Sequence, residues 1–344
     1  MKVIHIESGL GNQMLSYCEY LAMKKMNPND DCYIETIIYD IPECNDVICQ
    51  WNGYELDRIF HVNAPNIHDI ISPNDWDKLM GIIKESRFWE KNWNYPVYFT
   101  KAFHEIGIDL ENWRGDFETK ERLAIEEKNK MWYVKTLWYV HLRRIKKFLT
   151  NEKKLKRLDN EHKLYFTSDK NIFTGQQLLF KYKKGGIEKI EKEIKETFVF
   201  PTITDKKNQE VLNQIKNCNS VALHARKGDM DNYECYHNGY FRRATNYIRK
   251  NVSDPVYFVF CDPGSVEWAK THEKQIGLNF KKDHVQFVDW NKGTDSWRDM
   301  QLMTYCKHNI ITSSTFGWWG AWLNQNPDKI TCSPDITINT THYF

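Results

Sequence analysis

Basic residues, closely followed in the sequence by an acidic residue, lie where one predicted strand ends. Residues 221–225 have the composition of a strand, and residues 224–229 read HARKGD. Arg226 suits a diphosphate because its planar guanidinium can hold two phosphate oxygens, while a carboxylate such as Asp229 can fix its orientation. A preplaced cation also stabilises negative charge that builds on a departing phosphate. The run therefore predicts a diphosphate site, and a surface salt bridge is the alternative.

A second candidate anion site follows the predicted strand 309–312. Ser313, Ser314 and Thr315 place three hydroxyls directly before a helical run that reads GWWGAWL. Free N–H groups at a helix N-terminus favour an anion, and glycines let a ligand approach the backbone closely. Helix capping alone would account for one hydroxyl of the three. We therefore predict that this segment binds phosphate.

Asp262 is a candidate for recognising a base. It follows the predicted strand 256–261 and precedes a Pro-Gly pair that opens the next helix. The carboxylate could cap that helix, or it could accept hydrogen bonds from the N1 and N2 protons of guanine. Residue type alone favours the cap.

A glycine turn lies near the N-terminus, where residues 9–13 read GLGNQ. Met14 stands where a dinucleotide-binding fingerprint needs a third glycine, so hydride transfer is disfavoured. Gly11, Asn12 and Gln13 are expected instead to contact a sugar or phosphate. The two amides would do so by neutral hydrogen bonds.

The elements that must position these residues alternate between strand and helix. In the C-terminal half we predict strands at residues 221–225, 256–261, 285–288, 309–312 and 330–333. Such alternation predicts a parallel, doubly wound sheet whose ligands bind beyond the carboxyl ends of the strands. A strand at 2–7, a helix at 12–26 and a strand at 32–39 open a second unit.

The length of the chain predicts two domains, because 344 residues exceed what one core usually serves. We expect an N-terminal, acceptor-side domain at 1–200, which carries the glycine turn and a basic helical insertion. We expect a nucleotide-binding domain at 208–344, after a linker at 201–207.

Composition narrows the function classes. The formal net charge of +2 is too small for a nucleic-acid binder, so we expect no nucleic-acid partner. Nine irregularly spaced cysteines without a Cys-x-x-Cys pair indicate neither a disulfide framework nor a zinc site. With no signal-peptide pattern and no long apolar run, we expect a cytoplasmic enzyme without a membrane span. We also expect no metal and no other cofactor.

Residues 135–158 form a helical pattern that is locally basic. Its cations are Arg143, Arg144, Lys146, Lys147, Lys153, Lys154, Lys156 and Arg157, around Leu142, Ile145, Phe148 and Leu149. A solvated helix face is one interpretation of this pattern. Peripheral contact with an anionic membrane surface, at the inner face of the membrane, or with a lipid-linked glycan is the other.

Four sequence runs resemble, in their order, the bacterial α-1,2-fucosyltransferase family, glycosyltransferase family 11. They are GLGNQM at 9–14, YELDRIF at 54–60, HARKGD at 224–229 and DMQLMTYCKHNIITSSTFGWWGAWLN at 299–324. The resemblance implies a GT-B-like α/β fold, with two Rossmann-type domains facing a central cleft. It also implies inverting, metal-independent transfer of fucose from GDP-fucose to a galactose hydroxyl of a glycan, in α-1,2 linkage, as in O-antigen biosynthesis.

The resemblance also implies roles for individual residues. His224 should contact the nucleoside, Arg226 the β-phosphate and Asp262 the guanine. The remaining residues that we expect to bind substrate are Gly11, Asn12, Gln13, Lys227, Asp299, Ser313, Ser314, Thr315 and Phe316, with Ser314 and Thr315 on phosphate oxygens.

This sequence departs from the family pattern at three places. Lys227 replaces the second arginine of the motif, Glu7 and Ser8 replace small residues before the glycine turn, and Cys261 stands where serine is common. Lysine keeps the charge but loses the fork of an arginine, so we expect Arg226 to be the anchor and Lys227 an auxiliary.

An inverting transfer needs a base to take the acceptor proton. Glu234 is the first candidate, followed by Asp229 and His237, and substrate-assisted departure without a dedicated base is the alternative.

Two other functions compete with this prediction. One is an NAD-dependent dehydrogenase that uses the GLGNQ turn, with Asp30 or Glu35 on the ribose. The other is a non-enzymatic nucleotide-binding or membrane-binding scaffold.

Overall fold

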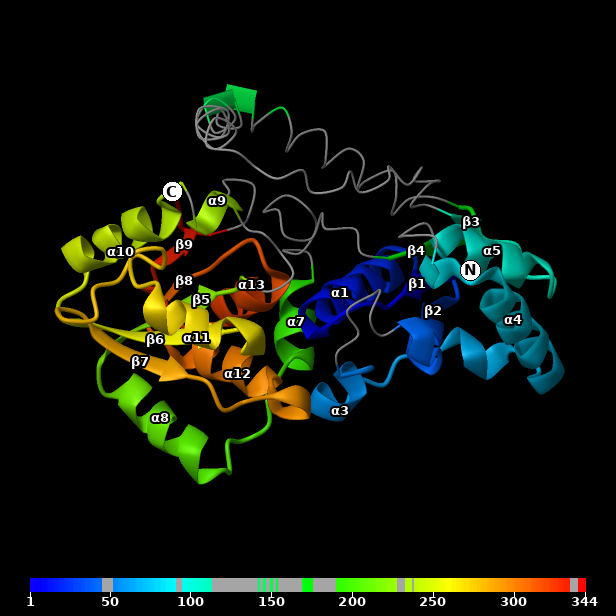
Figure 1. Ribbon diagram of the computed structural model, residues 1–344. Helices are drawn as coiled ribbons and strands as arrows, with labels where there is room; N and C mark the ends of the chain where they lie inside the picture. Colours follow the sequence, from blue (N-terminus) through cyan, green and yellow to red (C-terminus); the bar gives the residue numbers. More distant parts are fainter. Residues whose placement is uncertain are drawn as a thin grey trace. The chain divides into compact units, whose positions relative to one another are not determined.

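The protein is seen here in a computed structural model. It describes residues 1–44, 52–90, 95–112, 169–175, 190–227, 233–236, 238–334 and 340–344, together with six single residues between 142 and 153. The chain divides into two compact units (Figure 1). The first consists of Met1–Lys128 and Lys153–Val199, and the second of Asn129–Glu152 and Phe200–Phe344. Each unit is described by itself.

The first unit is built on a four-stranded sheet with the order β2-β1-β4-β3. Every neighbouring pair is parallel. The strands are β1 (Lys2–His5), β2 (Cys32–Glu35), β3 (Glu111–Asn112) and β4 (Ile172–Thr174). All of β1 is buried, as expected for a parallel strand that is covered on both faces.

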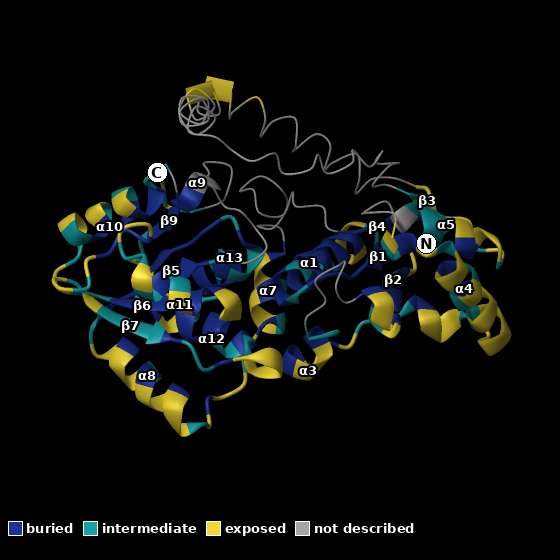
Figure 2. Cartoon of the chain, viewed as in Figure 1, coloured by how far each residue is buried: buried dark blue, intermediate teal, exposed yellow. Residues whose placement is uncertain are grey.

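The first unit also contains five α-helices within the described residues. They are α1 (Leu10–Met26), α3 (Leu56–Phe60), α4 (Pro73–Ser86), α5 (Tyr95–His104) and α7 (Glu191–Thr197), with short 3-10 helices at Ile37–Asp40, Pro42–Cys44, Ile67–Ile70 and Phe88–Glu90. Figure 2 shows α1 largely buried and the outer side of α4 exposed. The start of α4 is fixed by Ser72, whose hydroxyl accepts the N–H of Asp75 at 3.2 Å, and by Pro73 in the first turn.

The second unit is built on a six-stranded sheet with the order β10-β9-β8-β5-β6-β7, again parallel at every neighbouring pair. Its strands are β5 (Asn219–Ala225), β6 (Pro255–Cys261), β7 (His284–Val288), β8 (His308–Ile310), β9 (Thr331–Ser333) and β10 (His342–Tyr343). Its helices are α8 (Lys206–Lys216), α9 (Tyr233–Tyr236), α10 (Tyr240–Asn251), α11 (Val266–Thr271), α12 (Trp297–Tyr305) and α13 (Thr315–Trp322), with 3-10 helices at Pro263–Ser265 and Gly293–Asp295.

Side-chain alternation along β5 places helices on both faces of this sheet. Val221 and Leu223 belong to a core shared with residues of α10. Ala222 belongs to a separate core shared with residues of α8 and α12. Successive side chains of a strand point to opposite faces, so the sheet is doubly wound.

The α/β class and the two Rossmann-type units are therefore confirmed. The strands expected at 221–225, 256–261, 285–288 and 330–333 correspond to β5, β6, β7 and β9. The central cleft expected between the domains stays a prediction.

Three predicted strands are shorter than expected. The strand expected at 2–7 ends at His5. The strand expected at 32–39 ends at Glu35, because the carboxylate of Glu35 accepts the N–H of Ile37 and the chain turns into a 3-10 helix there. The strand expected at 309–312 ends at Ile310. The last part of the expected linker is also helical, since Asp205 caps α8 by accepting the N–H of Asn208 at 2.9 Å.

Most of the predicted basic helix at 135–158 lies outside the described residues. Across the described part of the chain, no helix combines the length and apolar composition that a bilayer span requires.

Candidate functional site

Three neighbouring strands of the second unit carry most of the predicted site residues at their carboxyl ends. β5 lies between β8 and β6 in the sheet. Arg226 and Lys227 follow β5, Asp262 follows β6, and the segment 313–316 follows β8 and leads into α13. Because all three strands are parallel, these ends lie at one edge of the sheet, where ligands of doubly wound folds bind.

His224 is a buried, uncharged side chain at this edge. It is 4% exposed, and its ring stacks on Phe316 with centroids 5.7 Å apart. Burial lowers the pKa of His224 to about 3, the positive charge of Arg226 adds to this effect, and the carboxylate of Asp262 opposes it. Nδ1 of His224 is buried and has no hydrogen-bond partner within the described structure. The imidazole is thus neutral, and its buried Nδ1 faces the backbone of Gly317.

Gly317 is required by the position of the His224 ring. A Cβ atom added at residue 317 would lie 2.9 Å from Cγ of His224, closer than such atoms approach in proteins. The glycine therefore lets α13 pack directly against the imidazole. This contact joins the end of β5 to the start of α13.

Asp262 links the ends of β5 and β6. Its Oδ1 accepts the backbone N–H of Lys227 at 2.9 Å, and its Oδ2 accepts the hydroxyl of Ser265. It makes no side-chain capping bond to the 3-10 helix that follows, unlike the role that residue type favoured. The ammonium of Lys227 lies 4.0 Å from the ring centroid of Trp268, a cation-π contact.

The start of α13 leaves a serine hydroxyl outside the helix cap. Ser314 is the residue before the helix and is 8% exposed, but its side chain makes no capping hydrogen bond. Ser313 and Thr315 are half-buried. The N–H groups of the first helical turn have no partner inside a helix, so this end suits an anion.

Asp299 takes part in a buried polar network, which sequence reasoning missed. It lies in the first turn of α12 and is 7% exposed. Its Oδ1 accepts the side-chain N–H of Asn291 at 2.7 Å, and Asn291 also exchanges hydrogen bonds with Asn208. Burial raises the pKa of Asp299 to about 8, although the bond from Asn291 lowers it. The polar residues Asp289 and Asn291, just after β7, were the available signal.

The side chain of Gln13 stabilises the glycine turn of the first unit. The side-chain amide of Gln13 donates to the carbonyls of Ser8 and Gly53, at 2.8 and 2.9 Å, and accepts the N–H of Glu55 at 2.9 Å. Both N–H groups are thus occupied, so Gln13 fixes the turn instead of offering an N–H to a ligand. Gly11 is buried in the first turn of α1, and Asn12 is half-buried.

A buried charged triad lies at the same end of this sheet. His5 ends β1, pairs in register with Glu35 of β2 and forms an ion pair with its carboxylate. The other ring nitrogen of His5 lies 3.5 Å from Glu7. Burial would lower the pKa of His5, but the two carboxylates outweigh it and raise the pKa to about 9. The sequence had marked Glu7 only as a departure from the family pattern.

The candidate bases are only partly described. Glu234 lies in α9, and its side chain is outside the described structure. Asp229 and His237 also lie outside the described residues. Their roles stay predictions.

Comparison with known proteins gives one family match. The family model of "Glycosyl transferase family 11" matches residues 145–338. An alpha-1,2-colitosyltransferase of Escherichia coli is 33% identical over 133 residues, covering 37% of this chain and 43% of that protein. The O-antigen biosynthesis glycosyltransferase WbnK of Escherichia coli is 36% identical over 127 residues, covering 35% and 39%.

A more distant relative is the galactoside alpha-(1,2)-fucosyltransferase 1 of Plecturocebus brunneus. It is 28% identical over 110 residues, covering 30% of this chain and 28% of that protein. The chain therefore matches less than half the length of each of these relatives.

Proposed function

Since the chain belongs to glycosyl transferase family 11, we propose that it transfers a sugar from a nucleotide donor to a glycan. The donor in this proposal is GDP-fucose, and the acceptor is a galactose hydroxyl that receives fucose in α-1,2 linkage. The names of the relatives support this choice, because they include an alpha-1,2-colitosyltransferase and a galactoside alpha-(1,2)-fucosyltransferase. WbnK, named for O-antigen biosynthesis, supports a bacterial surface glycan as acceptor.

The observation that carries the proposal is the composition of the strand ends in the second unit. The cation Arg226 follows β5, and the Ser314 hydroxyl and the N-terminus of α13 follow β8, the neighbouring strand. The buried imidazole of His224, whose Nδ1 packs against Gly317, joins the end of β5 to the start of α13. A cation, a hydroxyl and a helix N-terminus are the groups that bind a diphosphate.

The chemistry follows from the charge that develops in the reaction. When the bond between the sugar and the diphosphate breaks, negative charge accumulates on the departing phosphate. Arg226 would stabilise this charge with two parallel hydrogen bonds, without a metal in the proposed mechanism. An acceptor hydroxyl that attacks from the opposite face would invert the anomeric carbon, and Glu234 is the proposed base.

The dehydrogenase alternative loses one of its expected contacts. Glu35, one candidate for the cofactor ribose, is fully buried and already bound to His5 and to the N–H of Ile37. Asp30, the other candidate, lies 3.4 Å from the ammonium of Lys2. The carboxylate of Glu35 is therefore not available to a cofactor ribose.

The direct test is incubation of the protein with GDP-fucose and a panel of β-galactosides, with the product linkage read by NMR. The expected product carries fucose on the galactose 2-hydroxyl. Arg226→Ala should abolish it, and the matched control Arg87→Ala, which removes an exposed arginine of the first unit, should not. A product from nucleotide-linked colitose alone would replace the proposed donor, and NAD binding without a response to GDP would contradict the activity itself.

We also propose a peripheral contact with anionic lipid for the basic helical segment. Leu142, Ile145 and Leu149 are described as helical and are 60%, 59% and 73% exposed. Lys146 and Lys153 are exposed on the same helical face, as the residue spacing requires. Exposed apolar side chains beside cations are typical of helices that lie on a membrane surface.

Vesicle flotation tests this contact. The protein should float with phosphatidylglycerol vesicles and less with neutral ones, and Leu149→Glu should weaken the binding. Equal recovery of the wild-type protein and of Leu149→Glu would contradict the contact, while Tyr305→Glu, an exposed aromatic elsewhere, is the matched control.

A further inference from the structure

A basic groove runs along α10 in the second unit, apart from the residues assigned to the donor. It is a cavity of about 780 Å³ between the first turns of α10 and the loop 274–283. The charged residues in its wall are Arg242, Arg249, Lys274, Lys282 and Asp283. Four cations against one carboxylate leave a net charge of about +3, and the volume lies in the range of small-molecule sites.

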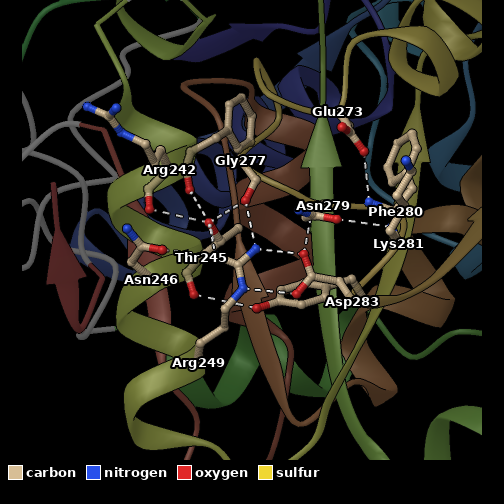
Figure 3. Close-up of polar contacts among 12 residues, drawn as sticks. Arg242, Thr245, Asn246, Arg249, Glu273, Gly277, Asn279, Phe280, Lys281 and Asp283 are labelled. Atoms are coloured by element: carbon tan, nitrogen blue, oxygen red, sulfur yellow. Dashed lines mark hydrogen bonds and ion pairs between the residues drawn. The ribbon is translucent and has the colours of Figure 1, made fainter.

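One ion pair in the groove holds the loop 274–283 in place. Arg249 donates from Nε and Nη2 to the two oxygens of Asp283, at 2.9 and 2.7 Å, and also to the carbonyl of Gly277 at 2.9 Å (Figure 3). Asp283 in turn accepts the N–H of Asn279 at 2.7 Å. This bidentate pair is therefore structural, and its charges cancel.

The other three cations of the groove do not hold the loop by ion pairs. Arg242, Lys274 and Lys282 are exposed, and none of them forms an ion pair within the described residues. In Figure 3, Arg242 extends from α10 outside the contacts drawn around Arg249 and Asp283. These three side chains leave the groove with an unbalanced positive charge.

The loop 274–283 packs directly against α10. This packing places the three cations along one groove. Gly277 has a φ of 73°, and a Cβ atom added there would lie 2.7 Å from the backbone nitrogen of Arg242. The hydroxyl of Thr245 donates to the carbonyl of Gly277 at 2.7 Å. Because only glycine fits this approach, the positions of Lys274 and Lys282 relative to α10 are fixed by the backbone.

The N-terminus of α10 also lies at the groove. The 12-residue helix begins after Gly239, which lines the groove. The side-chain oxygen of Asn238 accepts the N–H of Tyr240 at 3.1 Å, and the remaining N–H groups of the first turn have no partner inside a helix. A helix N-terminus favours an oxyanion.

We propose that this basic groove binds a phosphate-bearing ligand, a sugar phosphate or a diphosphate, separately from the donor nucleotide. Three unbalanced cations match the multiple charge of a phosphate ester better than the single charge of a carboxylate. The groove volume leaves room for a sugar beside the phosphate. The binding rests on groove residues alone, so it holds whether or not the proposed transferase activity is correct.

Calorimetric titration with inorganic pyrophosphate tests the site. The protein is first saturated with GDP, which would occupy the strand-end site. Pyrophosphate should still bind, with an affinity that falls as salt is added. Arg242→Ala and Lys282→Ala should each weaken binding by about fivefold, the effect of one charge contact near a protein surface.

Two further variants separate this site from the donor site. Lys250→Ala removes an exposed cation from the last turn of the same helix and should leave pyrophosphate affinity unchanged. Arg226→Ala should also leave it unchanged, even if GDP binding is lost. Three results would each contradict the proposed phosphate site. They are no pyrophosphate binding in the presence of GDP, equal affinity in Arg242→Ala and the wild type, or loss of binding in Arg226→Ala.

Discussion

Two buried histidines occupy corresponding places at the strand ends of the two units and have opposite charge states. His5 ends β1 and lies between Glu7 and Glu35, which raise its pKa to about 9 against the effect of burial. His224 lies next to the end of β5, where burial and Arg226 lower its pKa to about 3. The imidazole of the first unit is charged at neutral pH, and that of the second is neutral.

The difference extends to the polar groups around the two rings. In the first unit the imidazolium is paired with carboxylates, and Gln13 bonds to the turn with both of its N–H groups. In the second unit Nδ1 of His224 lacks a partner in the described structure, and the Ser314 side chain caps no helix. Buried polar groups are normally satisfied. The contrast therefore lies in the charges: carboxylates neutralise the imidazolium of the first edge, while the neutral imidazole of the second lies near the guanidinium of Arg226.

The largest expected effect tests the ligand-binding edge. Arg226→Ala should lower kcat/KM by about a thousandfold with little change in stability, because in the proposed mechanism Arg226 stabilises the charge of the transition state. Arg226→Lys should fail nearly as badly, since an ammonium cannot hold two phosphate oxygens in parallel. The measurement is fucose transfer at varied GDP-fucose concentration, and most activity retained by the lysine variant would show that the fork is unnecessary.

The next effect tests the two histidines through pH. His5 has a folded pKa above its ordinary value, so its contribution to the free energy of unfolding, about 3 kcal/mol, is present below pH 6.5 and is lost as the pH rises through 9. His224 has a folded pKa below its ordinary value, so it lowers stability as the pH falls from 6.5 toward 3.

NMR titration of the histidine rings reads both pKa values directly, with His5→Asn and His224→Asn assigning the signals. If both rings titrated near 6.5, the contrast between the two edges would be lost. Urea unfolding of the wild type should show the matching loss of stability at alkaline pH.

A smaller effect tests the contact between His224 and α13. Gly317→Ala would bring a methyl group against the imidazole, so the ring or the helix must shift, and we expect KM for the donor to rise about tenfold. Gly81→Ala in α4 is the matched control, because nothing lies within 4 Å of a Cβ atom there. The control should be neutral or slightly stabilising. Unchanged donor kinetics in Gly317→Ala would remove His224 from the site.

The smallest expected effect concerns metal removal. In the proposed mechanism the charge of the leaving diphosphate is balanced by Arg226 and the start of α13, so dialysis against EDTA should leave the transfer rate unchanged. The assay is repeated with added Mg²⁺ or Mn²⁺ in the same buffer. A rate that drops with EDTA and returns with Mg²⁺ would contradict metal independence.

The sequence predicted the strand ends of the second unit well, for a local reason. Apolar runs bounded by polar residues mark buried strands, and parallel alternation places their carboxyl ends at one edge. The positions of Arg226, Asp262 and Ser314 just after strands were therefore predicted from the sequence alone, and the strands were placed within a few residues.

The partners of these residues could not be predicted in the same way. The bond from the Lys227 N–H to Asp262 joins residues 35 positions apart, and the bond between Asn208 and Asn291 joins residues 83 positions apart. Such pairs arise only when strands and helices pack. Asp299 was therefore named as a ligand-binding residue, while its buried network with Asn291 was missed.

By itself the sequence determined the α/β class, the parallel sheets, the family and the strand-end residues of the second unit, because these follow from local periodicity and from short motifs. Only the tertiary structure decided the charge of the two histidines. A lone histidine in a strand can be charged or neutral, and burial together with carboxylates or a guanidinium brought from distant positions selects one state. The same packing decided that Gln13 holds a turn and that cations of α10 and its neighbouring loop share one groove.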